Sequence, residues 1–301
     1  MSKSESIEKH PKTADTHAAE KVPQKKIRYR TIWISDVHLG FRGCRADFLT
    51  DFLKNTRCET LYLVGDIIDL WNMKKGLYWP QAHNNVVRAI LSKARRNTRV
   101  VFIPGNHDEL IRDFGHAAFG NIEIQSQSEH ELANGKRMLI LHGDEFDSVV
   151  KFSPFLAKLG SHVYDWLIWA NRHINVVRRR MGFPYWSLAG LLKHKVKNAV
   201  NYISSFEDAI IKEAQKRGMD GVVCGHIHHA EIRMHGGALY CNCGDWVESH
   251  TALVEHENGR LEIVHWGDTR GTLHKWPADW SKAKPHLDGE SKDLLLAPML
   301  R

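Results

Sequence analysis

Short runs of apolar, often β-branched residues recur along the chain, each bounded by glycine or polar residues. Such continuous runs are typical of strands that are covered on both faces. They lie at Thr31–Ile34, Leu61–Val64, Val100–Ile103, Met138–Leu141 and Val222–Cys224. Apolar residues recur at helical spacing over Ala46–Leu53, His83–Ala94 and Ser205–Arg217. The alternation of strands and helices predicts an α/β fold.

The pattern changes in the last third of the chain, where residues 237–266 alternate without a helical segment. Glu257-Asn258-Gly259 separates two strand-like runs there, which predicts an antiparallel hairpin in a second sheet or at a mixed sheet edge. We expect one domain over residues 28–266. The polar segment 1–27 is rich in Lys, Glu, Thr and His, and we expect it and segment 267–301 to be tails outside the fold.

A polar block follows each of the five apolar runs. The blocks are Asp36-Val37-His38, Gly65-Asp66-Ile67-Ile68-Asp69, Gly105-Asn106-His107-Asp108, His142-Gly143-Asp144 and Gly225-His226-Ile227-His228. In open α/β sheets, ligands bind beyond the carboxyl ends of the strands. Carboxylate, amide and imidazole groups together suit manganese, iron or zinc. We predict seven ligands for two divalent metal ions: Asp36, His38, Asp66, Asn106, His142, His226 and His228.

Each block alone is weak evidence for a metal site. An Asp-X-His pair is commonly a surface or helix-cap feature, and the 20 histidines of the chain raise the chance of accidental pairs. The same position after a strand, repeated five times, favours the metal site. Residues two apart in an extended segment point the same way, so Asp36 and His38 can bind one ion together. Asp66 can bridge two ions through its two oxygens.

The ordered set D-x-H, G-D-x-x-D, G-N-H-D, H-G-D and G-H-x-H resembles the calcineurin-like metallophosphoesterases over roughly residues 30–266. The resemblance implies a four-layer α/β/β/α sandwich that carries two metal ions on its strand ends. It also implies that the chain is a metal-dependent phosphoesterase, because paired metals activate water and neutralise a phosphoryl group. One ion would be bound by Asp36, His38, Asp66 and His228, and the other by Asp66, Asn106, His142 and His226.

His107 is the expected catalytic residue, because it lies beside the ligand Asn106 and can donate a proton to the leaving oxygen. We expect Asp108 to orient its ring, and a structural role for His107 is the alternative. Asp69 and Asp144 are candidates for carboxylates that hydrogen-bond to ligand histidines, or for ordinary loop residues.

The net charge of +7 is concentrated in one segment. Residues 151–200 contain nine Lys or Arg and one acid, a charge of +8, within the 83 residues that separate His142 from His226. Insertions of this length beside a site commonly form lids or binding surfaces. Aromatic residues such as Trp166 and Trp169 accompany the cations, as at membrane surfaces or on single-stranded nucleic acid. The plainer alternative is a helical cap whose cations face water.

A narrower resemblance rests on the run from Gly65 to Trp71, on the length of the insert, and on the run from Gly244 to Ser249. These features are similar to the UDP-2,3-diacylglucosamine diphosphatase group, which releases UMP and a diacylglucosamine 1-phosphate. The resemblance implies an acylated nucleotide sugar as substrate, manganese as the metal with iron or zinc as alternatives, and a cap over about residues 151–200 that holds acyl chains at an anionic membrane surface. Lys193, Lys195 and Lys197 are expected to bind the anionic substrate.

The third block departs from that group, whose best-known branch resembles G-N-R-D, because His107 stands in the arginine position. A soluble metallophosphodiesterase acting on nucleotides or nucleic acid is therefore the alternative enzyme. A third interpretation is a phosphoesterase fold kept as a binding scaffold, and the complete set of seven ligands argues against it.

The sequence also predicts where the protein works. No run reaches the roughly 18 apolar residues of a membrane span, and residues 1–27 lack a secretory signal. Five cysteines without a framework spacing favour a reducing compartment. We therefore expect a cytoplasmic protein, peripheral on the inner face of the cell membrane. Cys241-Asn242-Cys243 could clip a metal ion, but two thiolates make only half a zinc site, and core packing is favoured.

Overall fold

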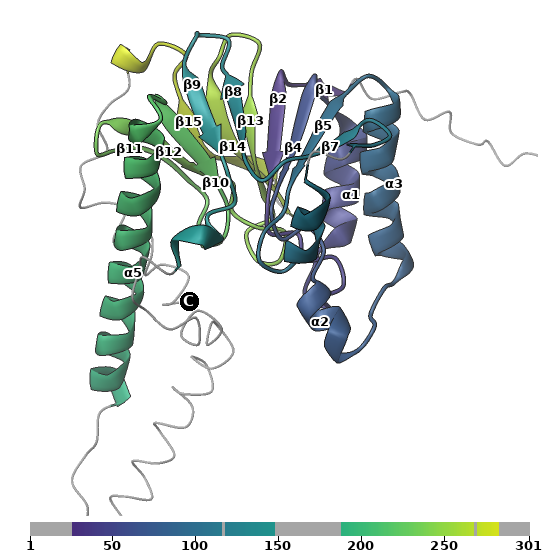
Figure 1. The fold of residues 1–301 in the computed structure, drawn as a ribbon, viewed down its shortest axis with the longest axis horizontal. Helices are drawn as coiled ribbons and strands as arrows, with labels where there is room; N and C mark the ends of the chain where they lie inside the picture. The colour runs from purple at the N-terminus through teal and green to yellow at the C-terminus, as the bar shows by residue number, and fades with distance from the viewer. Residues whose placement is uncertain (1–25, 116–117, 148–187, 268–269, 283–301) are drawn as a thin grey trace, which may run out of the picture.

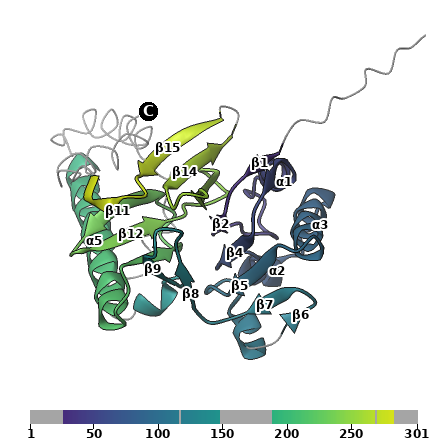
Figure 2. The same ribbon diagram turned by 90° about the horizontal axis from the view of Figure 1, so that it is seen from above.

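Two β-sheets face each other and carry helices on both outer sides (Figures 1 and 2). The structure is a computed structural model that describes residues 26–115, 118–147, 188–267 and 270–282. The larger sheet contains β2 (Thr31–Ile34), β4 (Thr60–Val64), β5 (Arg99–Ile103), β6 (Ala118–Phe119), β7 (Ile122–Ile124), β13 (Thr251–Glu255), β14 (Leu261–Trp266) and β15 (Arg270–Trp276). The smaller sheet contains β8 (Ser128–Glu131), β9 (Arg137–Ile140), β10 (Gly221–Cys224), β11 (Glu231–His235) and β12 (Ala238–Asn242). A separate short pair is formed by β1 (Ile27–Arg28) and β3 (Thr56–Arg57).

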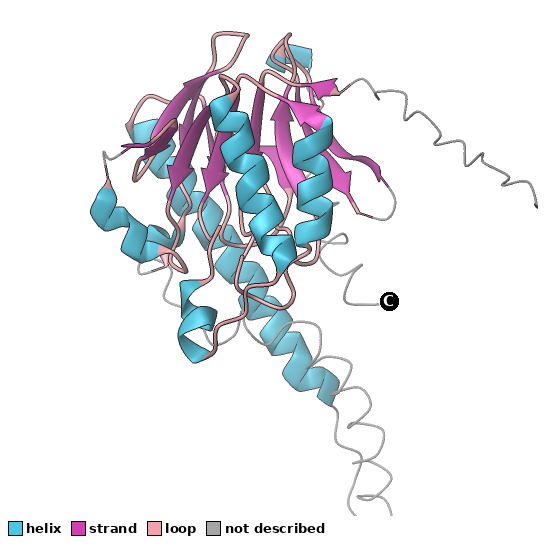
Figure 3. Cartoon of the chain, turned by 90° about the vertical axis from the view of Figure 1, so that its right-hand side faces the viewer, coloured by secondary structure: helices cyan, strands magenta, loops and turns pink. Residues whose placement is uncertain are grey.

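The helices complete the layers. Helices α1 (Ala46–Asn55) and α3 (Gln81–Arg95) cover the outer face of the larger sheet, as Figure 3 shows, and α5 (Leu188–Lys216) covers the smaller sheet. Shorter segments are α2 (Leu70–Lys75) and the 3-10 turns η1 (Glu109–Phe114), η2 (Asp144–Phe146) and η4 (Trp280–Lys282). The result is the α/β/β/α sandwich predicted from the sequence.

Strand order places the predicted blocks at one edge of the sandwich. The larger sheet runs β15-β14-β13-β2-β4-β5-β7-β6, and β2, β4 and β5 are parallel neighbours. The smaller sheet runs β11-β12-β10-β9-β8, with β9 and β10 parallel. Each of these five strands matches a predicted run to within one residue at either end. Parallel neighbours end at the same edge, so their following loops lie together.

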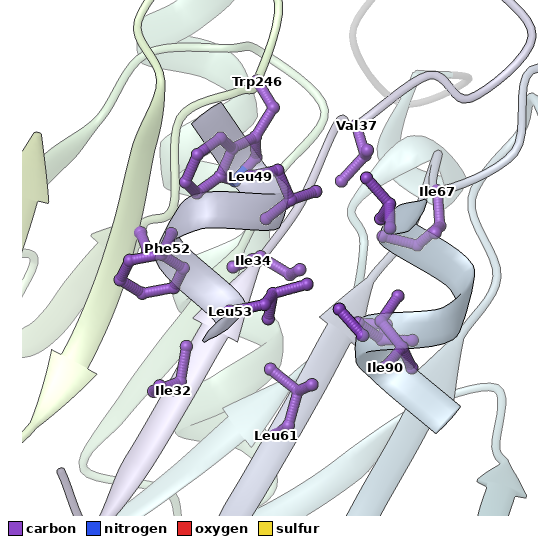
Figure 4. Close-up of a cluster of buried hydrophobic side chains, with 14 of the residues drawn as sticks. Ile32, Ile34, Val37, Leu49, Phe52, Leu53, Leu61, Ile67, Ile90 and Trp246 are labelled. Atoms are coloured by element: carbon purple, nitrogen blue, oxygen red, sulfur yellow. The ribbon is translucent and has the colours of Figure 1, made fainter. Parts of the chain in front are cut away.

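Apolar side chains fill three layers. Trp33, Tyr62 and Leu253 of the larger sheet lie in one buried cluster with residues of the smaller sheet such as Val223. The outer layer, shown in Figure 4, joins strand residues such as Ile32 and Ile34 to residues of α1 and α3. Successive residues of these strands point to opposite faces of the sheet, and both faces are buried. This explains the continuous apolar runs.

The cysteine pair belongs to this interior. Cys241 and Cys243 are fully buried in the cluster between the sheets, and Cys224 is buried under α5. All five cysteines are free thiols. Burial raises the pKa of Cys241 and Cys243 well above its usual range, so neither is poised to bind a metal as a thiolate. The core-packing prediction is confirmed.

The hairpin prediction is also confirmed, but two predicted boundaries change. Strands β13 and β14 pair antiparallel and join the larger sheet beside β2, whereas β12 of the same region lies in the smaller sheet. The predicted tail at 267–301 begins too early, because β15 extends the larger sheet to Trp276. This edge strand is mostly exposed and lacks an apolar face, which is why its sequence does not suggest a strand.

The predicted limits of the insert change at its end. Helix α5 starts at Leu188 and runs without a break past residue 200, so the insert and the predicted helix at Ser205–Arg217 share one element. Residues 148–187, with most of the insert and its tryptophans, lie outside the described residues, as do residues 1–25 and 283–301 of the predicted tails.

A buried carboxylate connects the two sheets. Glu255 on β13 accepts hydrogen bonds from Arg30 at 2.7 Å, from the Thr31 hydroxyl at 2.9 Å and from the Ala133 N–H at 2.8 Å. His130 of β8, in the opposite sheet, lies 3.0 Å from the same carboxylate. Burial raises the pKa of Glu255, but the bonds from His130 and Ala133 outweigh that effect and hold it below its ordinary value of 4.5.

We predict that Glu255→Ala lowers the free energy of unfolding by about 3 kcal/mol at pH 7, because it leaves buried partners unpaired. A group with a depressed pKa stabilises the fold above its unfolded pKa, and that stability is lost as the pH falls through the folded pKa. The difference between wild type and Glu255→Ala should therefore shrink below pH 4.5. Urea denaturation at several pH values tests this, with the exposed Glu129→Ala as control. A difference that stays constant down to pH 3 would contradict it.

Candidate metal centre

The five blocks meet because the loops after the strands continue the pairing of the strands. The Asp36 N–H donates to the Gly65 carbonyl at 3.1 Å, and the His38 N–H donates to the Asp66 carbonyl at 2.9 Å. In the smaller sheet, the Gly225 N–H donates to the His142 carbonyl at 3.2 Å. The backbone of His226 also donates to the Asp36 carboxylate at 3.1 Å, which joins the loops of the two sheets.

The backbone of these loops is unusual. Seven described non-glycine residues have positive φ, and five of them are predicted ligands: Asp36 (51°), His38 (54°), Asp66 (54°), His226 (71°) and His228 (56°). The left-handed region costs energy for such residues, so it persists where the surroundings enforce it, commonly at functional sites. Asp36 and His38 do not lie in the extended segment predicted from the sequence. Left-handed turns bring their side chains together instead.

Asp66 lies at the centre of the cluster, 2% exposed. One carboxylate oxygen, Oδ1, accepts the His107 N–H at 2.8 Å. The other, Oδ2, faces Nε2 of His142 at 3.5 Å, of His107 at 3.9 Å and of His38 at 4.0 Å. Three imidazole nitrogens thus surround one oxygen at distances too long for good hydrogen bonds.

A second set of ligand atoms lies next to the first. Nε2 of His228 is 3.1 Å from Asp36 Oδ1 and 3.4 Å from His38 Nε2. Ligand atoms of Asp36, His38 and His228 all lie within 4.8 Å of one another, as do those of Asp36, Asp66 and His142. His38, Asp66 and His107 form a third such group, so the described residues bring together three overlapping groups of ligand atoms.

Two buried polar atoms show that this cluster suits a cation. Asn106 Oδ1 and His142 Nε2 are buried and have no hydrogen-bond partner among the described residues. Nδ1 of His142 lies 3.0 Å from the Val64 carbonyl, so Nε2 is the ring nitrogen that faces Asp66. Buried polar atoms are otherwise nearly always paired, so a divalent metal ion fits this donor set.

Glycines make room for the cluster. A Cβ on Gly65 would lie 2.0 Å from Nδ1 of His142, and one on Gly105 would lie 2.3 Å from Asp66 Oδ1 and 2.6 Å from His142 Nε2. Neither position admits a side chain unless the ligands move. The first residue of both the G-D-x-x-D and G-N-H-D motifs is therefore a steric requirement.

The electrostatics of the cluster favour positive charge. Burial lowers the pKa of His142, but the charges of Asp66, Asp36 and Asp144 outweigh it and raise that pKa to about 10. Burial also lowers the pKa of His228, but the charge of Asp36 outweighs that effect and raises the pKa to about 9. Burial raises the pKa of Asp66, yet the histidines hold it well below its usual range. Buried carboxylates here require a compensating cation, either protons on histidine or a metal ion.

His107 is held by Asp69 and not by Asp108. Its Nδ1 lies 2.9 Å from Asp69 Oδ1, and Trp71 packs on its ring with centroids 4.4 Å apart. Asp69 also contacts Nδ1 of His38 at 3.2 Å, so one carboxylate orients both histidines. The predicted role of Asp108 is wrong. Its carboxylate accepts backbone N–H groups, including that of Ile67 at 2.8 Å, and so fixes the loop.

Asp147, which the sequence did not single out, contacts His226. Nε2 of His226 lies 2.8 Å from Asp147, which also accepts the Tyr202 hydroxyl at 2.6 Å. Asp144, the candidate for such a role, instead binds Arg112 at 2.6 and 2.8 Å. Asp144 is the last residue of the H-G-D motif and Asp147 follows it by three residues, and the sequence holds no signal that assigns the contact with His226 to either.

The predicted substrate-binding lysines Lys193, Lys195 and Lys197 lie on α5, and the structure describes only their backbone. Phe206, nine residues after Lys197, lies beside Gly143 next to the metal centre. Nine helical residues span roughly 13 Å, so Lys197 lies more than two turns farther along the helix.

The chain is similar to a known protein family and to several known proteins. A family model described as Calcineurin-like phosphoesterase matches residues 29–230. The UDP-2,3-diacylglucosamine hydrolase of Azotobacter vinelandii is 25% identical over 228 residues, which cover 72% of this chain and 90% of the relative. That of Blochmanniella pennsylvanica is 33% identical over 119 residues, covering 38% of this chain and 46% of the relative. Yfce, a phosphoesterase from E. coli, is 14% identical, with a TM-score of 0.41 over 81% of this chain and 97% of its own.

The chain therefore belongs to the calcineurin-like phosphoesterase family. It is a metal-dependent hydrolase, and among its relatives are several named UDP-2,3-diacylglucosamine hydrolase. Among the described helices, none has the length and apolar character required of a membrane span.

We predict that Gly105→Ala weakens manganese binding about tenfold or more, because its methyl group displaces Asp66 and His142. Gly76→Ala, at an exposed position with open space around it, is the matched control and should bind as wild type does. Equilibrium dialysis with manganese measures both. Equal affinities in the two variants would show that the close approach at Gly105 has no role in binding.

Proposed function

We propose that this protein hydrolyses the pyrophosphate of UDP-2,3-diacylglucosamine, releasing UMP and diacylglucosamine 1-phosphate. The observation that carries the proposal is the buried cluster around Asp66, in a chain that aligns with relatives of that name over most of their length. A phosphate-bearing substrate matches a cluster that would hold cations at the edge of the sheets.

We assign one ion to Asp36, His38, Asp66 and His228, and the other to Asp66, Asn106, His142 and His226. Because Asp147 occupies Nε2 of His226, that ring would bind through Nδ1. When bound, two divalent ions supply an activated water and neutralise charge on the phosphoryl group. Manganese is our choice, and iron or zinc would fit the same donors.

His107 would hold a proton at Nε2 for the leaving oxygen. Its contact with Asp69 fixes Nδ1 and directs Nε2 toward the cluster. A leaving phosphate such as UMP needs less acid assistance than an alkoxide. The His107–Asp69 pair therefore also supports a second candidate, a phosphodiesterase that acts on nucleotides or nucleic acid.

Apolar residues near the metal centre support an amphiphilic substrate. Leu77 is 78% exposed just after α2, and Leu110 is 50% exposed on η1. Both segments start directly after motif residues, namely Asp69 and Asp108. We propose that these side chains face acyl chains at an anionic membrane surface inside the cell. The lysines of α5 and a helical cap over about residues 151–200 would hold the remainder of the substrate.

We predict manganese-dependent release of UMP when the purified chain is given UDP-2,3-diacylglucosamine. The parallel reaction uses bis-p-nitrophenyl phosphate, and chelation of the metal with EDTA should stop both. Hydrolysis of the generic ester alone would favour the second candidate. The failure of both reactions would count against any phosphoesterase activity.

His107→Ala should lower kcat by about a hundredfold or more, since it removes a positioned proton donor. It should retain the manganese content of the wild type, as measured by elemental analysis. Asp69→Asn should also lower kcat, because Asp69 holds the His107 ring toward the cluster. Loss of metal from His107→Ala would instead show that the residue is structural.

Vesicle flotation tests the membrane contact. Leu77→Ser/Leu110→Ser should reduce recovery of the protein with anionic vesicles, because each substitution removes an exposed apolar side chain that we expect to enter the interface. The control Met234→Ser/Leu273→Ser changes two exposed apolar residues on β11 and β15. Equal recovery of both variants would argue against a membrane-facing rim beside the metal centre.

A further inference from the structure

A pocket lies at the opposite end of the strands that carry the metal centre. Its volume is about 760 Å³, which is within the usual range for small-molecule sites. Glu59 and Thr98, which line it, directly precede β4 and β5, whereas Asp66 and Asn106 follow the same strands. Each strand has five residues, so roughly 13 Å or more separates the pocket from the metal centre.

The walls of this pocket are strongly basic. They contain seven cations and one acid: Lys26, Arg28, Lys54, Arg57, Arg88, Lys93 and Arg96, with Glu59. Arg28 is paired with Glu59 at 3.2 Å and with Glu257 at 2.9 Å. Within the described part of the chain, the other six cations form no ion pair. Burial and the neighbouring Arg96 and Arg57 lower the pKa of Lys26, as expected where cations face one another without an anion.

Helix ends alone do not account for this charge. Helices α1 and α3 direct their carboxyl ends to this region, and cations commonly neutralise such ends. A helix end carries only about half a negative charge, so two ends offset about one of the six cations. The positive charge of the other cations is therefore not balanced by the helix ends.

The lining indicates the chemistry of the ligand. Lys93 is 8% exposed, and its Nζ donates to the Thr56 carbonyl at 2.8 Å, which fixes the ammonium group in the wall. Asn85, Ser92 and Asn97 add polar groups, and none of the lining residues is aromatic. The absence of a stacking surface in this lining disfavours a nucleobase, whereas several guanidinium groups suit phosphoryl oxygens.

We propose that this basic pocket binds an anion with several phosphoryl groups, separately from the metal centre. The pocket would recognise the charge and spacing of the phosphates and not an attached base. A free polyphosphate and a lipid phosphate headgroup share this chemistry, and they are distinguished below.

The test uses the manganese-loaded, full-length chain and inorganic tripolyphosphate in equilibrium dialysis at near-physiological salt. Arg88→Gln/Arg96→Gln removes two exposed cations of α3 and its end, and Lys212→Gln/Lys216→Gln removes two exposed cations of α5 as the matched control. Any binding at the metal centre is common to all three proteins. Turnover of bis-p-nitrophenyl phosphate should be equal in all three, which shows that the fold is intact.

We expect Arg88→Gln/Arg96→Gln to bind the probe about tenfold more weakly, since two charge-assisted contacts are lost, and the control to match wild type. Equal binding by all three proteins, or equal losses in both variants, would overturn the proposal. Flotation with phosphatidic acid vesicles then distinguishes a lipid phosphate headgroup from a free polyphosphate as the ligand of the pocket. A loss confined to Arg88→Gln/Arg96→Gln supports a lipid headgroup, and unchanged flotation supports a free phosphate.

Discussion

The buried carboxylate of Asp66 is the constraint on which the site depends. A charge that is 2% exposed must be balanced, and the fold supplies three imidazole nitrogens at 3.5–4.0 Å from one of its oxygens. Those side chains come from strands of both sheets, so the site exists only when the sandwich is closed. This convergence requires left-handed backbone at several ligand residues. It also requires glycine where a side chain would collide with the ligands.

The sequence predicted the strands that are buried on both faces and the blocks of polar residues that follow them. Continuous apolar runs identified β2, β4, β5, β9 and β10, since burial on both faces leaves no polar position in a strand. The blocks after these runs identified the residues that now cluster, because parallel strands end at one edge. Long-range pairing was harder to predict. Strand β15 is exposed and polar, and Asp147 lies only three residues after Asp144, so only the folded structure shows which of the two acids contacts His226.

The sequence predicted only one of the two histidine contacts of Asp69. It was a candidate partner for a ligand histidine, and it contacts His38 as expected. It also holds His107, the role that the sequence suggested for Asp108. Asp108 is instead used by backbone N–H groups, and burial beside Asp66 raises its pKa to about 6. Asp69 of the G-D-x-x-D motif therefore orients two histidines, whereas Asp108 of the G-N-H-D motif fixes the loop.

The sandwich thus carries opposite charge at its two ends, with buried acids after β4 and β5 and a basic pocket before them. We propose that two metal ions share the Asp66 carboxylate. Anomalous diffraction at the manganese edge from crystals of the manganese-loaded protein tests it most directly. We expect two peaks, each within coordinating distance of the Asp66 carboxylate. A single peak, or peaks that leave Asp66 uncoordinated, would contradict it.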